Sequence, residues 1–180
     1  VGADGKPRRW VYVHFFKPGQ PTLNWLHPSN AAQRAVDGGL VQLIHRLGAR
    51  GVRLDAVPFL GIEPVPGSAT TLHYQHPLSI AGTNHLAFLA RKLGGWSYQE
   101  LNVPLDRLKV FVKNGPDLSY DFFTRAQILH ALLMGDAALL RQAFRFLKEA
   151  GVEPLWLVHD LQNHDEITYQ LVELGARANE

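Results

Sequence analysis

Two kinds of apolar segment alternate between residues 30 and 174, and this alternation constrains the fold more than any other feature. Short runs rich in β-branched and aromatic residues alternate with longer segments whose apolar residues recur at helical spacing. The expected strands are residues 52–56, 96–100, 118–123 and a run that begins near Trp156. Such alternation is typical of a mainly parallel sheet covered by helices. We therefore expect an α/β fold.

The expected helices lie between these strands. They cover residues 30–47, 83–93, 104–112, 125–150 and 167–174. Ser29 or Asn30 is expected to cap the first of these helices and Thr83 the second. The helix at 125–150 is expected to break at Gly135 and to start again with Asp136 as a new cap. A further strand is expected at residues 10–16, ahead of the alternating part. Residues 58–78 are rich in proline and glycine, and ordered loops of this length usually have a function.

Composition excludes several classes of function. The chain has 180 residues, enough for one domain with a core, and no cysteine, so disulfides, zinc–thiolate sites and cysteine nucleophiles are ruled out. A net charge of +2 without a run of five like charges does not favour a nucleic-acid partner. No apolar stretch approaches the roughly 18 residues of a membrane span. We expect no membrane partner and, by default, a cytoplasmic protein; the oligomeric state stays open.

Charged residues stand where three of the expected strands end. Arg53 and Asp55 are two residues apart and so share one face of a strand, while Glu100 ends the next strand. His164 and Asp165 follow the last apolar run. In barrel enzymes the catalytic groups lie at the C-terminal ends of parallel strands. The carboxyl groups of Asp55, Glu100 and Asp165 are therefore expected to meet in one pocket.

Two carboxyl groups in different environments suit the cleavage of a glycosidic bond. One acts as an ionised nucleophile, and the other stays protonated to donate to the leaving oxygen. Arg53 favours the ionised form of Asp55, and burial among Trp96, Tyr98 and Leu101 is expected to raise the pKa of Glu100. Asp165 beside His164 suits hydrogen bonds to sugar hydroxyls and the stabilisation of positive charge at the anomeric carbon.

Each of these residues also has an ordinary interpretation. Arg-x-Asp on a strand is often a structural ion pair, and an Asn-His-Asp segment often forms a turn. Glu100 alone is an unremarkable acid at a strand end, and Glu63, in the proline-rich loop, is a rival for its role. The placement of all three acids at successive strand ends favours a site, with Glu100 as the acid. No metal site is predicted, because the histidines lack ligand spacing such as HExxH.

Two segments resemble conserved strands of the α-amylase superfamily, glycoside hydrolase family thirteen. GVRLDAVPF (residues 51–59) is similar to its nucleophile strand, and VHDLQNHDE (158–166) to its third-carboxylate strand. QPTLNWLHPS (20–29) resembles the segment that leads into the helix before the nucleophile strand. The RLDAVP and NHDE forms are closest to trehalose synthase (maltose α-D-glucosyltransferase) and related enzymes that transfer α-glucosyl groups. The resemblance spans residues 14–174.

The resemblance implies roles for five residues. Asp55 matches the nucleophile, Arg53 its supporting arginine, and His164 with Asp165 the pair that binds the transition state. Glu100 matches the acid/base, although Tyr98-Gln99 precede it where the family usually has a small residue just before this glutamate. Asn102 agrees with the trehalose synthase pattern. Pro58 and Phe59 replace the Lys-His pair of starch-cutting amylases.

The resemblance further implies that residues 1–180 are the C-terminal half of a (β/α)8 barrel, strands four to seven. A whole barrel needs about 250 residues. The segment alone is expected to be inactive and prone to aggregation. The implied substrate is an α-glucoside such as maltose, and the implied chemistry is retaining glucosyl transfer or isomerisation. A hydrolytic α-glucosidase or amylase-type enzyme and a non-catalytic relative are the alternatives. No cofactor is expected, although calcium binding by a full-length parent is possible in this family.

Overall fold

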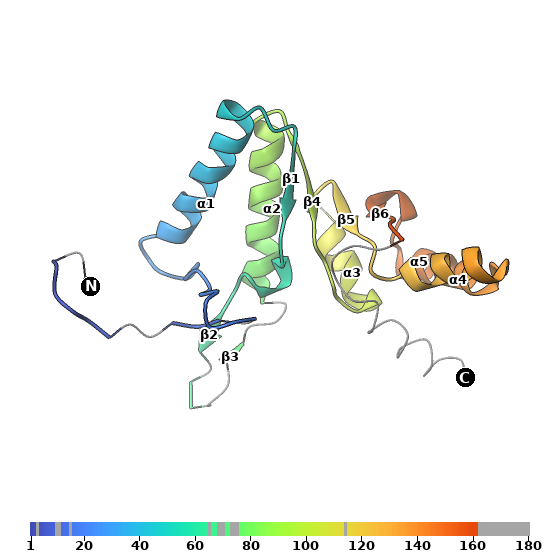
Figure 1. The fold of residues 1–180 in the computed structure, drawn as a ribbon, viewed down its shortest axis with the longest axis horizontal. Coiled ribbons are helices and arrows are strands. Elements are labelled where there is room, and N and C mark those ends of the chain that lie inside the picture. Colours follow the sequence, from blue (N-terminus) through green and yellow to red (C-terminus); the bar gives the residue numbers. More distant parts are fainter. Residues whose placement is uncertain are drawn as a thin grey trace.

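A four-stranded parallel sheet forms the centre of the protein in the computed structural model, which describes residues 1–161 except 3, 10, 11, 15, 65, 68–70, 73–75 and 114. The strands lie in the order β1-β4-β5-β6, so neighbours in the sheet follow one another along the chain (Figure 1). Their bounds are Gly51–Leu54 for β1, Trp96–Gln99 for β4, Leu118–Tyr120 for β5 and Leu157–Val158 for β6. All three pairings are parallel, as the sequence predicts.

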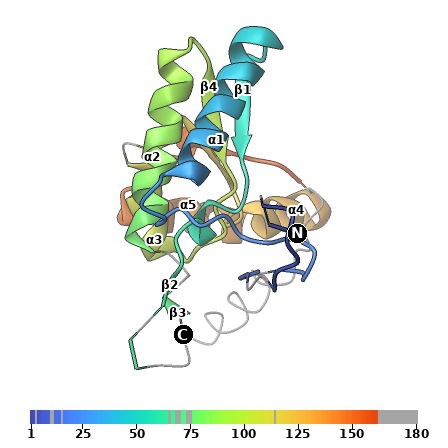
Figure 2. The same cartoon turned by 90° about the vertical axis from the view of Figure 1, so that its left-hand side faces the viewer.

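Helices connect the strands. Helix α1 (Ala31–Val41) precedes β1 and continues toward it as a π-helical turn (Gln42–Arg46). Helix α2 (Pro77–Lys92) lies between β1 and β4 in the sequence, and α3 (Leu105–Val112) lies between β4 and β5. Two helices, α4 (Arg125–Met134) and α5 (Ala138–Ala150), lie between β5 and β6. Helices α1 and α2 lie side by side next to the β1 end of the sheet (Figure 2). Short 3-10 turns (Val57–Phe59, Pro154–Trp156) and the antiparallel pair of β2 (Glu63–Pro64) with β3 (Thr71–Leu72) complete the elements.

Apolar side chains fill the space between the sheet and its helices in two clusters. The first contains Val57, Leu101, Leu108, Phe111, Val112, Leu147, Val152 and Leu157. The second contains Leu40, Ile44, Val52, Leu86 and Ala90. Both clusters draw on alternate strand positions, Val52 in β1 and Leu157 in β6, so one face of the sheet is committed to the core.

The expected strand at residues 10–16 is wrong for the residues that the structure describes there. His14 makes only an isolated bridge to Pro21, and the Thr22 amide donates to the Val13 carbonyl at 2.8 Å. Proline has no N–H to donate to a ladder, so Pro18 and Pro21 limit how far this pairing can extend.

Helix α2 begins six residues before the predicted start at residue 83, since it begins at Pro77. The reason is an unexpected cap: His76 Nδ1 accepts from the Leu78 amide at 3.0 Å, and Pro77 suits the first helical position. Thr83 instead bonds within the helix, to the Ser79 carbonyl. Helix α1 starts as predicted, but Asn30 makes no side-chain cap bond.

The predicted break in the segment from residue 125 to 150 is confirmed. Gly135 adopts a left-handed conformation with φ of 67° that ends α4, and Asp136 Oδ1 accepts from the Ala138 amide at 2.8 Å to start α5. The strand expected from Trp156 begins one residue later, after a 3-10 turn. The helix predicted for residues 167–174 lies outside the described residues.

None of the described helices is both long and apolar enough to cross a lipid bilayer.

Replacing a core leucine tests the packing between α5 and the sheet. Leu147 is 0% exposed, whereas Leu133 on α4 is 74% exposed. Leu147→Ala is expected to lower the free energy of unfolding by about 2–5 kcal/mol, because it removes buried methyl groups and leaves a cavity. Leu133→Ala is the control and is expected to change it by less than about 0.5 kcal/mol. Urea unfolding curves measure both, and equal effects would contradict the placement of Leu147.

Candidate functional site

The sheet face opposite the core carries the polar and aromatic residues of the candidate site. In the pairing of β1 with β4, Arg53 stands beside Tyr98 and Leu54 beside Gln99. Gln99 Nε2 donates to Ser119 Oγ at 2.8 Å on the core side. Because side chains alternate along a strand, Arg53 and Tyr98 lie on the other face.

Asp55 and Glu100 follow directly after the last residues of β1 and β4. The Glu100 amide donates to the Leu54 carbonyl at 2.9 Å, so the strands stay paired to this level. Ala56 then turns the chain away in a left-handed conformation with φ of 47°, which is unusual for a residue with a Cβ. In this turn the Ala56 amide donates to Glu100 Oε2 at 2.9 Å. The backbone after Asp55 thus helps to fix the carboxyl group of Glu100.

Arg53 links the two acids. Its Nη1 contacts Asp55 Oδ1, and its Nη2 lies 3.2 Å from Glu100 Oε2. The second contact is close enough for an ion pair but does not have the geometry of a hydrogen bond. Among the described residues, the buried Nη2 therefore has no hydrogen-bond acceptor. The side chains of Arg53, Asp55 and Glu100 are 26%, 68% and 17% exposed, so the glutamate is the most enclosed of the three. The structure therefore brings together three of the five residues that the sequence predicts.

Burial raises the pKa of Glu100, and its hydrogen bond and charge repulsion with Asp55 raise it further. The Ala56 amide and the charge of Arg53 lower it, but these effects are smaller in sum. The direction agrees with the expectation from the sequence. A glutamic acid whose pKa is raised, beside an aspartate, is the pairing that acid catalysis needs.

The two carboxyl groups interact directly through a hydrogen bond. Retaining glycosidases keep their two carboxyl groups about 5–5.5 Å apart, with room for the sugar between them. Asp55 is 68% exposed, so rotation of its side chain into solvent meets little obstruction. A ligand can therefore enter between the two carboxyl groups once the Asp55 side chain turns away from Glu100.

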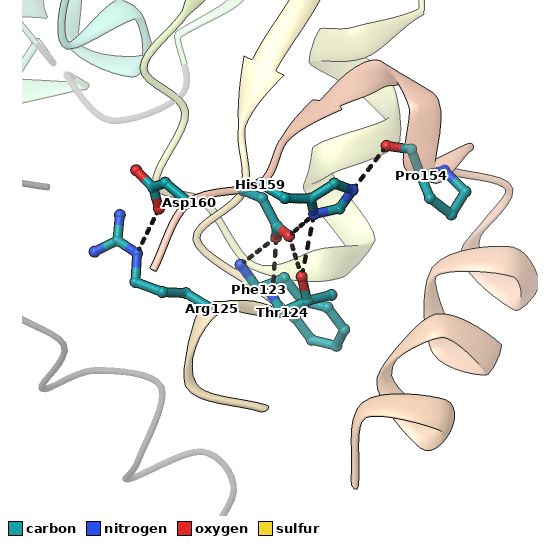
Figure 3. Close-up of polar contacts among 7 residues, drawn as sticks. Phe123, Thr124, Arg125, Pro154, His159 and Asp160 are labelled. Carbon is teal, nitrogen blue, oxygen red and sulfur yellow. Dashed lines mark hydrogen bonds and ion pairs between the residues drawn. The ribbon is translucent and has the colours of Figure 1, made fainter. Parts of the chain in front are cut away.

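A second polar cluster joins the ends of β5 and β6 (Figure 3). Asp121, which is 2% exposed, accepts from the amides of Phe123 and Thr124 at 2.9 and 2.8 Å. His159 Nδ1 lies 2.5 Å from Asp121 Oδ2, and its Nε2 lies 3.1 Å from the Pro154 carbonyl. The His159 ring thus bridges the Asp121 carboxylate, which follows β5, and the Pro154 carbonyl, which precedes β6, so this pair ties two strand ends together.

Next to this cluster, the buried side chain of Arg125 forms an ion pair with Asp160, whose side chain is 21% exposed (Figure 3). Arg125 Nε donates to Asp160 Oδ1 at 3.0 Å, and the guanidinium carbon lies 5.0 Å from the centre of the Phe122 ring. Neither terminal nitrogen of Arg125 has an acceptor among the described residues. Asp160 lies two residues beyond Val158, which pairs with Tyr120.

Asp160 is not among the site residues predicted from the sequence. Its position after the apolar run of β6 was a signal that could have found it, because every other residue of a strand faces the same way. The pairing with Arg125 had no such signal, since 35 residues separate the two along the chain.

The remaining candidates divide into two groups. His164 and Asp165 lie outside the described residues, so their predicted roles stay predictions. Glu63 does not join the site: its carboxylate lies 3.0 Å from His76 Nε2 and is 58% exposed. Within the described part of the chain, no three histidine, cysteine or acidic side chains are grouped so as to hold a metal ion.

Compared with models of known protein families, the chain matches none, and it matches no curated protein either. The chemistry of the described residues is therefore the basis for any functional assignment.

The raised pKa of Glu100 predicts how stability depends on pH. Between the ordinary value of 4.5 and the higher folded value, the unfolded chain has lost the proton that the folded chain still holds. The contribution of Glu100 to stability is therefore full below pH 4.5 and is lost as the pH rises through the folded pKa. Relative to the wild type, Glu100→Gln is expected to become more stable as the pH rises from about 4 to 7.

Denaturant unfolding at a series of pH values measures this difference. Glu153→Gln, at an exposed glutamate before β6, is the matched control and is expected to follow the wild-type slope. A constant difference between wild type and Glu100→Gln across this range would contradict the burial of Glu100.

Proposed function

We propose that the chain is part of a catalytic barrel of the α-amylase type that cleaves α-glucosidic bonds with retention and transfers the glucosyl group to a sugar hydroxyl. The observation that supports this most directly is the meeting of Asp55 and Glu100, at the ends of two adjacent parallel strands, with Arg53 in contact with both. A paired carboxylate and protonated carboxylic acid at one edge of a parallel sheet suit this chemistry.

The fold supports the proposed barrel origin. Consecutive strands of a (β/α)8 barrel lie next to each other, are all parallel and are joined by helices on one side. Strands β1, β4, β5 and β6 are arranged in this way. In the proposal residues 1–180 supply strands four to seven of the barrel, so the segment by itself leaves the pocket incomplete.

In the first chemical step, an Asp55 carboxylate oxygen attacks the anomeric carbon of an α-glucoside. The bond from that carbon to the leaving oxygen breaks as Glu100 gives its proton to this oxygen, and a glucosyl ester of Asp55 forms. In the second step, ionised Glu100 takes the proton of an incoming hydroxyl, whose oxygen attacks the anomeric carbon and releases Asp55. Each step inverts the configuration at the anomeric carbon, so the overall reaction retains it.

Each group has an environment that suits its role. Burial and the neighbouring Asp55 raise the pKa of Glu100, which favours the protonated form that can donate to the leaving oxygen. Once Asp55 is esterified its negative charge is gone, and with it the repulsion that opposes ionisation of Glu100. Arg53, in contact with both groups, favours the charged form of each in turn. The same glutamate can therefore act first as acid and then as base.

His164 and Asp165 complete the proposed site by resemblance: they would bind the sugar hydroxyls and stabilise positive charge at the anomeric carbon. The leading alternative is a hydrolytic α-glucosidase or amylase-type enzyme, in which water takes the place of the acceptor sugar. A non-catalytic relative that only binds α-glucosides is the third candidate.

Two substitutions in the full-length parent protein test the assigned roles. Asp55→Asn is expected to lower kcat/KM about 100-fold or more on both maltose and 4-nitrophenyl α-glucoside, because the nucleophile is lost. Glu100→Gln is expected to have a comparable effect on maltose, but a much smaller one on formation of the glucosyl ester from 4-nitrophenyl α-glucoside, because nitrophenolate leaves without a proton. Release of 4-nitrophenol in the pre-steady state measures that step.

Asp106→Asn, at an exposed aspartate of α3, is the control and is expected to retain activity. Turnover of maltose by Asp55→Asn at a near-native rate would contradict the proposal.

Transfer and hydrolysis are separated by the products formed from maltose. Transfer or isomerisation predicts trehalose in the reaction mixture, whereas hydrolysis predicts glucose alone. Proton NMR of the mixture over time distinguishes the anomeric signals. Binding of maltose in a calorimeter without any product would favour the non-catalytic relative.

A further inference from the structure

The guanidinium group of Arg53 has a contact with a tyrosine two strands away, in addition to its contacts with the two acids. Its central carbon lies 5.4 Å from the centre of the Tyr120 ring, within the range of a cation–π interaction. Arg53 is in β1 and Tyr120 is in β5, with β4 between them in the sheet. The arginine side chain therefore crosses the neighbouring strand to reach the ring.

Tyr120 is itself held in place by Tyr98. The two rings meet edge to face, with centres 5.5 Å apart and an angle of 87° between their planes. Burial raises the pKa of Tyr98, and its hydrogen bond with Tyr120 raises it further. Both contacts restrict the orientation of Tyr120 on the site face of the sheet.

The position of Arg53 thus depends on contacts with three strand ends. Asp55 on its own strand binds Nη1, Glu100 on the next strand lies beside Nη2, and the Tyr120 ring lies beneath the guanidinium carbon. Asp55 is exposed and so offers the weakest positional restraint. An arginine side chain has many rotamers, and contact with an aromatic ring favours some of them over others.

We propose that Tyr120 is a positioning residue, which holds the Arg53 guanidinium against the carboxyl groups of both Asp55 and Glu100. Its catalytic meaning rests on the function proposed above, but the placement of the charge does not. In this role Tyr120 acts through Arg53. Without it, the guanidinium follows Asp55 toward solvent and spends less time beside Glu100.

The titration of Glu100 is the direct readout, and it requires no turnover. Carbon-13 NMR of protein labelled at the glutamate carboxyl carbon follows this group, and Glu100→Gln identifies its signal. Arg53 lowers the pKa of Glu100, so Tyr120→Leu, which removes the ring, is expected to raise that pKa. Tyr120→Phe keeps the ring and loses the hydroxyl, and a smaller rise is expected.

Tyr12→Phe is the matched control for loss of a tyrosine hydroxyl. Tyr12 donates to the Pro18 carbonyl at 2.8 Å and is not part of the site, so Glu100 is expected to titrate as in the wild type. An unchanged or lowered pKa of Glu100 in folded Tyr120→Leu would overturn the proposal. If that variant does not fold, an unchanged pKa in Tyr120→Phe together with an unchanged chemical shift of the Arg53 Nε nucleus would overturn it.

Kinetics separate this inference from the proposed function. In an active parent protein, Tyr120→Leu is expected to move the basic limb of the pH profile of kcat/KM upward, in step with the NMR titration, which a loss of stability alone would not do. The parent protein could have no activity while Tyr120→Leu still raises the pKa of Glu100. That result would contradict the proposed function but would support Tyr120 as the residue that positions Arg53.

Discussion

The register between β1 and β4 is the constraint on which the site depends. Leu54 pairs with Gln99, and the next residue on each strand is an acid. A shift of one residue in either strand would turn Arg53 or Glu100 toward the apolar core, where a charge is very costly. The core contacts of Val52 on one face and the site on the other therefore specify the same pairing. The parallel direction places both acids at the C-terminal edge.

The two neighbouring acids have different electrostatic environments. Glu100 is largely enclosed and accepts a hydrogen bond from the Ala56 amide, whereas Asp55 is open to solvent. The positive charge of Arg53 offsets part of the repulsion between the two carboxyl groups, and Tyr120 holds Arg53 in place. The site is therefore not two independent side chains but a small network across three strands, in which the protonation of one member alters the others.

The parts of this arrangement that are local in sequence could be predicted. Strand ends and alternation are enough to place Arg53, Asp55 and Glu100 on one face. The early start of α2 depends on a histidine acting as a cap, which helix propensity alone does not indicate. The contact of Arg125 with Asp160 and that of Asp121 with His159 each join residues more than thirty positions apart in the sequence. These contacts depend on how the first turn of α4 and the 3-10 turn before β6 are placed. Such contacts follow from packing and have no periodic signal.

The central claim is that Asp55 forms a bond to the sugar. A glucosyl fluoride with a second fluorine on the ring slows release of the ester more than its formation, because fluorine destabilises the positive charge of the transition state. Incubating the full-length parent with this compound and digesting it should give the peptide that contains Asp55 with the added mass of one fluoroglucosyl group. A labelled Glu100, or an unmodified protein that still turns over maltose, would contradict the claim.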